Sequence, residues 1–146
     1  MSSILIVEDN LSDYESVIRA FKKLGVKDEV YHCSTGEEAL DFLFRRKAYK
    51  NEKDAPRPSI ILLDLNLPGT DGRDVLQQIK SDPQLKSIPV VVLTTSDSDK
   101  DIKTCYAYGA NSYMVKPTDW EAFFKMMENF RNYCLKSTAL PDKSGG

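Results

Sequence analysis

Four short apolar segments of the chain each end in side chains that are able to do chemistry. In chain order these side chains are Glu8 and Asp9, then Asp64, then Thr94 and Thr95, and finally Lys116. If the segments are strands whose carboxyl ends meet, three carboxylates gather at one point and repel one another. A hard cation relieves that repulsion, and an acidic pocket lined with oxygen atoms suits Mg²⁺. The lone lysine would then face an incoming anion.

The segments that must position these residues follow a regular α/β pattern. Apolar runs of strand length lie at residues 3–7, 29–33, 59–63, 88–93 and 112–115, and longer amphipathic stretches separate them. Near-continuous apolar strands suit a parallel sheet that is covered on both faces, and strict alternation with helices favours β-α-β units. We therefore expect an α/β fold, a doubly wound (βα)₅ five-stranded parallel sheet.

The strand order 2-1-3-4-5 explains how residues far apart in the sequence can share a cation. In a doubly wound sheet, ligands bind at the carboxyl ends of the strands where the winding direction reverses. In this order that crevice lies between the first and third strands, which deliver Glu8, Asp9 and Asp64.

Capping signals and helix breakers place the helices. Capping boxes at residues 12–15, 35–38 and 118–121 predict the starts of the first, second and fifth helices. Gly25 closes the first helix, a third spans about 72–80 before Pro83, and a fourth covers about 99–108. The charged segment 45–58 is longer than the usual helix-to-strand connection, and we expect a solvated loop there.

Length and composition fit one ordinary domain. We expect it to cover residues 1–136 of the 146, followed by a disordered polar tail at 137–146. The net charge of −2, with 20 Lys and Arg against 22 Asp and Glu, does not point to nucleic acid or to an anionic membrane. No apolar run approaches the roughly 20 residues of a membrane span, so a cytoplasmic protein is expected. The three cysteines lack a C-x-x-C pair and suggest neither a disulfide framework nor a zinc site.

The ordered set of strand-end residues resembles the receiver domain of two-component response regulators, which accept a phosphoryl group on one aspartate. The resemblance covers about residues 3–133 and also includes Pro68, Asp71 and Gly72, Gly109 and Ala110, and Tyr113. It implies the flavodoxin-like receiver fold. It also implies a Mg²⁺-dependent phospho-acceptor that signals through protein contacts, and not a conventional enzyme.

The resemblance assigns a role to each residue of the metal site. Asp64 would be the phosphorylated residue and, with Asp9, a direct metal ligand. Glu8 would hold a metal-bound water, and the backbone carbonyl of Asn66 would supply a third protein oxygen.

The resemblance also implies how the phosphoryl group is held and sensed. Lys116 would pair with one of its oxygens, and the Thr94 hydroxyl would donate to another. Thr94 and Tyr113 would then form a switch that reshapes the face built by the fourth helix, the fifth strand and the fifth helix, where we expect a homodimer. A cis peptide bond between Lys116 and Pro117 is implied as well.

Within the family, residues 39–46, the long loop, and residues 64–69 and 92–96 look like the small regulators that are paired with cyanobacterial phytochromes. The implied partner is therefore a sensor histidine kinase of the phytochrome type. The only histidine, His32, has no metal-ligand partner at a useful spacing and is expected to be a surface or packed strand residue.

Three other functions stay open. A phosphatase of the haloacid-dehalogenase type also uses an aspartate nucleophile and Mg²⁺. Its D-x-D pattern carries a second aspartate as proton donor, and Asn66 occupies that position here. A flavodoxin-like FMN protein shares the winding, whereas Glu8 and Asp9 would repel its phosphate. A receiver that works as an interaction module without phosphorylation is the third alternative.

Overall fold

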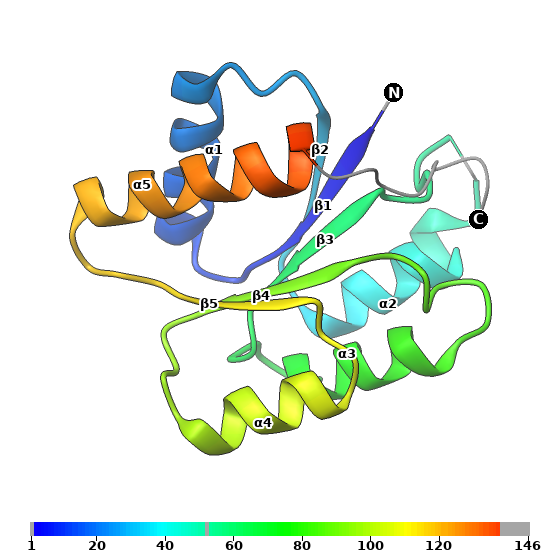
Figure 1. The fold of residues 1–146 in the computed structure, drawn as a ribbon. Coiled ribbons are helices and arrows are strands. Elements are labelled where there is room, and N and C mark those ends of the chain that lie inside the picture. The colour runs from blue at the N-terminus through cyan, green and yellow to red at the C-terminus, as the bar shows by residue number, and fades with distance from the viewer. Residues whose placement is uncertain (1, 52, 138–146) are drawn as a thin grey trace.

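The computed structural model describes residues 2–51 and 53–137 of the chain, and it confirms the doubly wound α/β fold. In the described residues five parallel strands form one sheet in the order β2-β1-β3-β4-β5, as Figure 1 shows. The strands are β1 (Ser3–Val7), β2 (Glu29–Cys33), β3 (Ile60–Leu63), β4 (Val90–Thr94) and β5 (Ser112–Val115). The central strands β1, β3 and β4 are buried along their whole length, as expected for a sheet covered on both faces.

Helices cover both faces of the sheet. These are α1 (Leu11–Leu24), α2 (Gly36–Phe44), α3 (Gly72–Ser81), α4 (Asp99–Ala107) and α5 (Trp120–Phe130), with a 3₁₀ turn η1 (Lys47–Tyr49) and a π-helix η2 (Arg131–Ser137). Alternate residues of β1 point to opposite faces: Ile4 and Ile6 pack with α1 and α5, and Leu5 and Val7 pack with α2 and α3. Figure 1 shows α1 and α5 on one side of the sheet and α2, α3 and α4 on the other.

The strand register brings the chemically active residues to one level. Val7 of β1 pairs with Leu63 of β3, so Glu8 and Asp64 follow neighbouring strands at the same height. Thr94 of β4 pairs with Val115 of β5, which puts Lys116 just beyond the same edge of the sheet.

Two of the three predicted capping boxes are wrong. Asn10, and not Ser12, caps α1 by accepting the Asp13 N–H at 2.9 Å. Asp119, and not Thr118, caps α5 by accepting the Ala122 N–H at 3.0 Å. Asn and Asp cap helices as well as Ser and Thr do, so a Ser/Thr-x-x-Glu pattern next to such a residue does not identify the first turn.

Most described residues of segment 45–58 are exposed, as expected for a solvated loop, but the segment is also fastened to the domain. Ala55 is only 1% exposed and belongs to the core. Arg45 donates from Nε to the Ala55 carbonyl at 3.2 Å, and Tyr49 donates to a carboxylate oxygen of Glu38 in α2 at 2.9 Å. The guanidinium of Arg45, at the C-terminal end of α2, and the hydroxyl of Tyr49 thus fasten the loop to α2.

Of the tail predicted at residues 137–146, residues 138–146 lie outside the described residues. Its first residue, Ser137, is the last residue of η2. No helix within 2–51 and 53–137 is long and apolar enough to cross a bilayer. All three cysteine thiols are free, and Cys33 and Cys105 are buried.

Candidate functional site

Three carboxylates gather at the carboxyl ends of β1 and β3. Glu8, Asp9 and Asp64 each offer one oxygen, and these oxygens all lie within 4.8 Å of one another. Glu8 and Asp64 are 4% and 7% exposed, whereas Asp9 is open to solvent. A set of carboxylate oxygens with one open side fits a hard divalent cation that keeps part of its water shell.

Lys116 is the cation that the structure places against this acidic cluster. Its Nζ donates to Glu8 Oε1 at 2.5 Å, to Asp13 Oδ2 at 3.0 Å and to Asp64 Oδ2 at 3.2 Å. An ammonium group carries three N–H bonds, so each bond has a carboxylate partner. The Lys116 side chain is 8% exposed, which means that one buried positive charge faces several negative ones.

Asp13 is a site residue that the sequence reasoning missed. It was read as part of a capping box at residues 12–15, whereas it occupies the third helical position of α1, after the cap Asn10. That position turns its carboxylate toward the strand ends and into contact with Lys116. The sequence offered one signal for this residue. With Asn10 as the cap, Asp13 lies in the first turn of α1, close to Glu8 and Asp9.

The charges in the pocket shift the pKa values of its members. Burial raises the pKa of the Glu8 carboxyl to about 7; the hydrogen bond from Lys116 opposes this shift, and the charge of Asp64 adds to it. Burial by itself lowers the pKa of Lys116, but the hydrogen bond to Glu8 and the charge of Asp64 outweigh it and raise the pKa. The lysine is thus cationic, and the pocket keeps an excess of negative charge.

Asp64 is held rigidly where β3 ends. One carboxylate oxygen, Oδ1, accepts the Leu65 N–H at 2.7 Å and lies 3.4 Å from the Asn66 nitrogen. The start of α3 packs so closely that a Cβ atom on Gly72 would lie 2.2 Å from the Asp64 carbonyl oxygen. A residue with a side chain would clash there, so the start of α3 packs directly on the backbone of Asp64 and Leu65. Asn66 is exposed beside this loop.

Thr94 and Tyr113 are joined through one loop residue, Ser96. Thr94 is fully buried at the end of β4, and its Oγ1 lies 3.4 Å from the Ser96 nitrogen. The Tyr113 hydroxyl donates to the Ser96 carbonyl at 2.8 Å. The two predicted switch residues do not need direct contact, since both touch the same peptide segment.

The implied cis peptide bond is wrong. Within the described residues every peptide bond is trans, including the one between Lys116 and Pro117. The trans form is the more stable one even before proline, and the lysine side chain reaches Glu8 and Asp64 from it.

His32 is a packed strand residue, as expected, but it also supports the acidic turn. Its ring stacks on Tyr14 with centroids 3.7 Å apart and an angle of 6° between the planes. Its Nε2 lies 2.8 Å from the Glu8 carbonyl oxygen, so this nitrogen carries the proton and donates it.

A five-stranded parallel sheet with an acidic cluster, a lysine and a buried threonine at one edge defines a class of protein. The model of the response regulator receiver domain family matches residues 4–128, so the chain belongs to that family. It is 41% identical over 138 residues to the response regulator Rcp1 of Synechocystis, with 94% of this chain and 92% of Rcp1 covered. It is 42% identical over 132 residues to FilR2 of Methanothrix harundinacea, described as a probable methanogenesis regulatory protein, with coverage of 90% and 83%.

Solved structures agree with the sequence relatives. The crystal structure of Mn²⁺-bound Rcp1 matches with a TM-score of 0.90 and 39% identity, covering 97% of this chain and all 100% of that one. The structure of the phosphorylated cyanobacterial phytochrome response regulator RcpA matches with a TM-score of 0.90 and 40% identity, at 97% and 99% coverage. The chain is therefore a response regulator receiver that is similar to phytochrome response regulators, as its sequence motifs predicted.

Proposed function

We propose that this protein accepts a phosphoryl group on Asp64 from a sensor histidine kinase, in a Mg²⁺-dependent reaction, and signals through protein contacts. The observation that carries this proposal is the position of the Asp64 carboxylate. It belongs to the acidic cluster that fits a divalent cation, and its Oδ2 lies 3.2 Å from the buried ammonium of Lys116.

The transfer is a displacement at phosphorus. A bond forms between an Asp64 carboxylate oxygen and phosphorus, and the bond from phosphorus to the imidazole nitrogen of the kinase phosphohistidine breaks. The electron pair of that bond stays on the imidazole, which takes a proton from solvent. Apart from the attacking carboxylate, the receiver would contribute to this reaction mainly by positioning the phosphoryl group and neutralising its charge.

The residues of this chain divide that work among them. Lys116 would pair with one oxygen of the transferred group, and the Thr94 hydroxyl would donate to another. Asp9 and Asp64 would bind the cation directly, with Glu8 through water and the Asn66 carbonyl as a further ligand. Bound Mg²⁺ would neutralise negative charge on the phosphoryl oxygens. The phosphorylated RcpA and Mn²⁺-bound Rcp1 structures support this assignment because both proteins share the fold.

Labelling by a small phosphodonor tests the acceptor. Acetyl phosphate and Mg²⁺ should add one phosphoryl group, detected by intact-mass analysis. Asp64→Asn should abolish this labelling and keep the fold, because an amide of similar size replaces the carboxylate. Asp74→Asn, at an exposed position of α3, is the matched control and should label like the wild type. Undiminished labelling of Asp64→Asn would refute the assignment.

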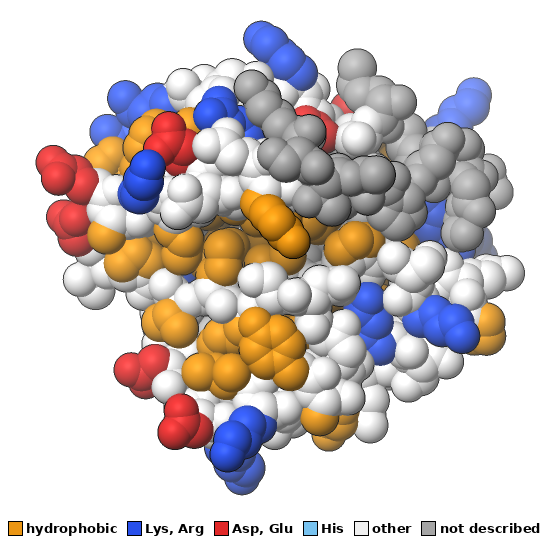
Figure 2. Space-filling model, viewed as in Figure 1, with side chains coloured by type: hydrophobic (Ala, Val, Ile, Leu, Met, Phe, Trp, Pro, Cys, Tyr) orange, Lys and Arg blue, Asp and Glu red, His pale blue; other side chains and the backbone are white. Residues whose placement is uncertain are grey.

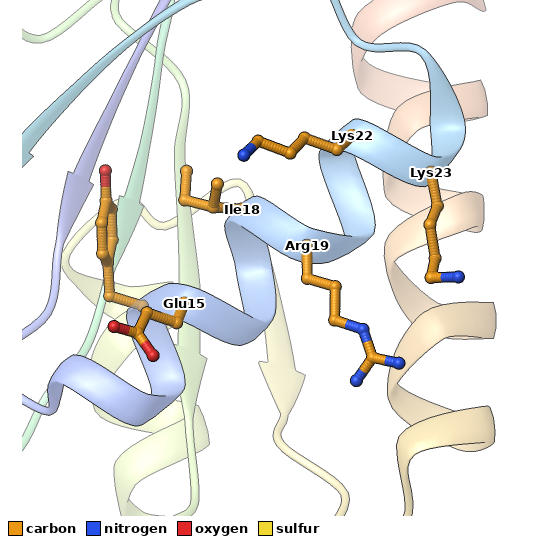
Figure 3. A pocket seen from close by; sticks show the side chains of 6 residues that line it. Glu15, Ile18, Arg19, Lys22 and Lys23 are labelled. Carbon is orange, nitrogen blue, oxygen red and sulfur yellow. The ribbon is translucent and has the colours of Figure 1, made fainter.

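We infer that the kinase approaches along α1. A groove of about 450 Å³ beside Lys116 is lined by Ser12, Ser16 and Trp120, among other residues. A second hollow of about 430 Å³ continues along α1, where Figure 3 shows Ile18 beside basic side chains. An apolar residue among basic side chains, on the helix that also lines the groove beside Lys116, suits a partner surface.

Transfer from a purified phytochrome kinase tests this approach. Ile18→Asp should slow that transfer without changing labelling by acetyl phosphate, because only the kinase uses the surface. Equal slowing with both donors would contradict a docking role for Ile18. A failure of every phytochrome kinase with the wild type would remove the partner assignment and leave the acceptor untouched.

We further propose that phosphorylation controls a homodimer through α4, β5 and α5. Figure 2 shows apolar side chains gathered over this part of the surface. Tyr106 of α4 and Val115 of β5 are 48% and 39% exposed, and Tyr133 beyond α5 is 72% exposed. Sedimentation with and without a phosphoryl mimic tests the proposal, and an unchanged mass distribution at micromolar concentrations would contradict it.

A further inference from the structure

An ion-paired clamp joins the first turns of α3 and α4, which pack side by side (Figure 1). Arg73 of α3 donates from Nε to Asp101 Oδ1 at 2.9 Å, and its Nη2 lies 2.9 Å from Asp101 Oδ2. Its Nη1 also contacts Asp71, the cap of α3, at 2.9 Å. The side chains of Arg73 and Asp101 are 26% and 19% exposed, so the pair is partly shielded from water. A planar fork of this kind is specific to arginine.

The clamp does not end at α4, because Asp101 also holds Ser96. The Ser96 hydroxyl donates to Asp101 Oδ2 at 2.6 Å. The Ser96 carbonyl accepts the Tyr113 hydroxyl at 2.8 Å, and the Ser96 nitrogen lies 3.4 Å from Thr94 Oγ1. Ser96 thus makes polar contacts with Asp101, Thr94 and Tyr113 together.

We infer that Arg73 and Asp101 are positioning residues of the Tyr113 switch, because they hold Ser96 so that its carbonyl accepts the Tyr113 hydroxyl before any phosphoryl group is present. This inference rests on the proposed switch role of Thr94 and Tyr113. The residues that flank Ser96, Thr95 and Asp97, are exposed, so the loop has little packing of its own to fix that carbonyl. The clamp therefore biases the switch toward the arrangement in which Tyr113 lies on the loop between β4 and α4.

The clamp is a permanent feature at neutral pH. The hydrogen bonds from Arg73 and Ser96 lower the pKa of Asp101 to about 2, despite the opposing effect of burial. The carboxylate thus stays ionised throughout the physiological range, and the bias is set by the residue types and not by proton binding.

The position of Tyr113 tests the inference directly. The protein is labelled with 3-fluorotyrosine, and the Tyr113 resonance is assigned by its loss in Tyr113→Phe. In the absence of a phosphodonor, Asp101→Asn should move this resonance toward the value of a solvated tyrosine, with the equilibrium shifted about fivefold, the usual effect of losing one partly exposed charged contact. Ser96→Ala should give a similar shift, because it cuts the link while leaving the pair of Arg73 and Asp101 in place.

Two further variants separate positioning from stability. Asp99→Asn removes an exposed carboxylate from the same first turn of α4 and should leave the Tyr113 resonance unchanged. Arg73→Lys keeps the charge but not the fork, so it should give a shift between those of Asp99→Asn and Asp101→Asn. If Asp101→Asn and Ser96→Ala both lower the melting temperature while the Tyr113 resonance stays in place, the two residues support only stability and the inference is wrong.

Labelling at Asp64 keeps this inference separate from the proposed function. Each variant is also treated with acetyl phosphate and Mg²⁺. Normal labelling with an unmoved Tyr113 resonance overturns the clamp alone. Absence of labelling in the wild type overturns the proposed function, and the resonance measured without phosphodonor still decides whether Arg73 and Asp101 position Tyr113.

Discussion

Adding Mg²⁺ to the metal-free protein should stabilise its fold, because the cation binds a pocket that exists only in the native state. Glu8, Asp9 and Asp64 bring three carboxylates within 4.8 Å of one another, and Lys116 supplies one positive charge. At a free Mg²⁺ concentration ten times its dissociation constant, the free energy of unfolding should rise by about 1.4 kcal/mol. For a domain of this size that gain corresponds to an increase in the melting temperature of about 3–6 °C.

The size of this effect should depend on pH through Glu8. Its pKa in the metal-free fold, about 7, is above the ordinary value of 4.5 for a glutamate, so the folded state binds the proton more tightly than the unfolded state does. The stability that this proton contributes is fully present below about pH 4.5 and is lost as the pH rises to about 7, with an upper bound of about 3 kcal/mol. Mg²⁺ competes with the proton, so the stabilisation by Mg²⁺ should be largest above pH 7 and shrink toward pH 5.

Thermal melts in EDTA and in millimolar Mg²⁺, recorded between pH 5 and 8, measure both effects. Asp9→Asn should weaken the response to Mg²⁺, and Glu8→Gln should flatten the pH dependence of the metal-free protein. Asp74→Asn, which removes an exposed carboxylate outside the pocket, should behave like the wild type. Melts that ignore Mg²⁺ at pH 8 would refute the metal pocket, and a response that is constant from pH 5 to 8 would refute the competition at Glu8.

Three further predictions concern the switch and the fold. Thr94→Ala should still be labelled by acetyl phosphate. It should lose the phosphorylation-dependent change in sedimentation, because it lacks the hydroxyl that would donate to a phosphoryl oxygen. Asp101→Asn should cost about 1 kcal/mol at pH 7, allowing for partial exposure, as measured by urea unfolding. Because the pKa of Asp101 is lowered to about 2, this difference should be present above about pH 4 and disappear as the pH falls toward 2. Gly72→Ala should destabilise by about 3 kcal/mol in the same assay, because its Cβ atom would overlap the Asp64 carbonyl oxygen.

The strand ends could be predicted because their pattern leaves few choices. Continuous apolar runs such as Ile60–Leu63 must be buried on both faces, and parallel strands then carry their carboxyl ends to one edge. In the structure Val7 pairs with Leu63 and Thr94 with Val115, which sets these ends at one level. The gathering of the acidic cluster and Lys116 was therefore contained in the sequence. The presence of a bound cation and the phosphorylation of Asp64 stay predictions.

The features that sequence reasoning missed all depend on how far a side chain reaches across elements. Asn10 and Ser12 are both good caps, and only the packed start of α1 selects Asn10 and turns Asp13 toward Lys116. The charge of segment 45–58 indicated its exposed residues, but not that Ala55 is buried and that Arg45 donates to its carbonyl. Local patterns give the type of an element, and tertiary contacts decide which of several equivalent side chains is used.

The contacts of Lys116 indicate which of them must give way when Asp64 is phosphorylated. All three ammonium N–H bonds have carboxylate partners. The bond to Asp64 can pass to an oxygen of the attached phosphoryl group, and a second phosphoryl oxygen can be bound only if Glu8 or Asp13 leaves. Glu8 is buried, and releasing it would leave an unpaired charge away from water, which is costly. The Asp13 side chain is 42% exposed and can be hydrated as it leaves. We therefore expect phosphorylation to detach Lys116 from Asp13. Phosphorylation of Asp64 would then change the contacts of the first turn of α1, which contains Asp13.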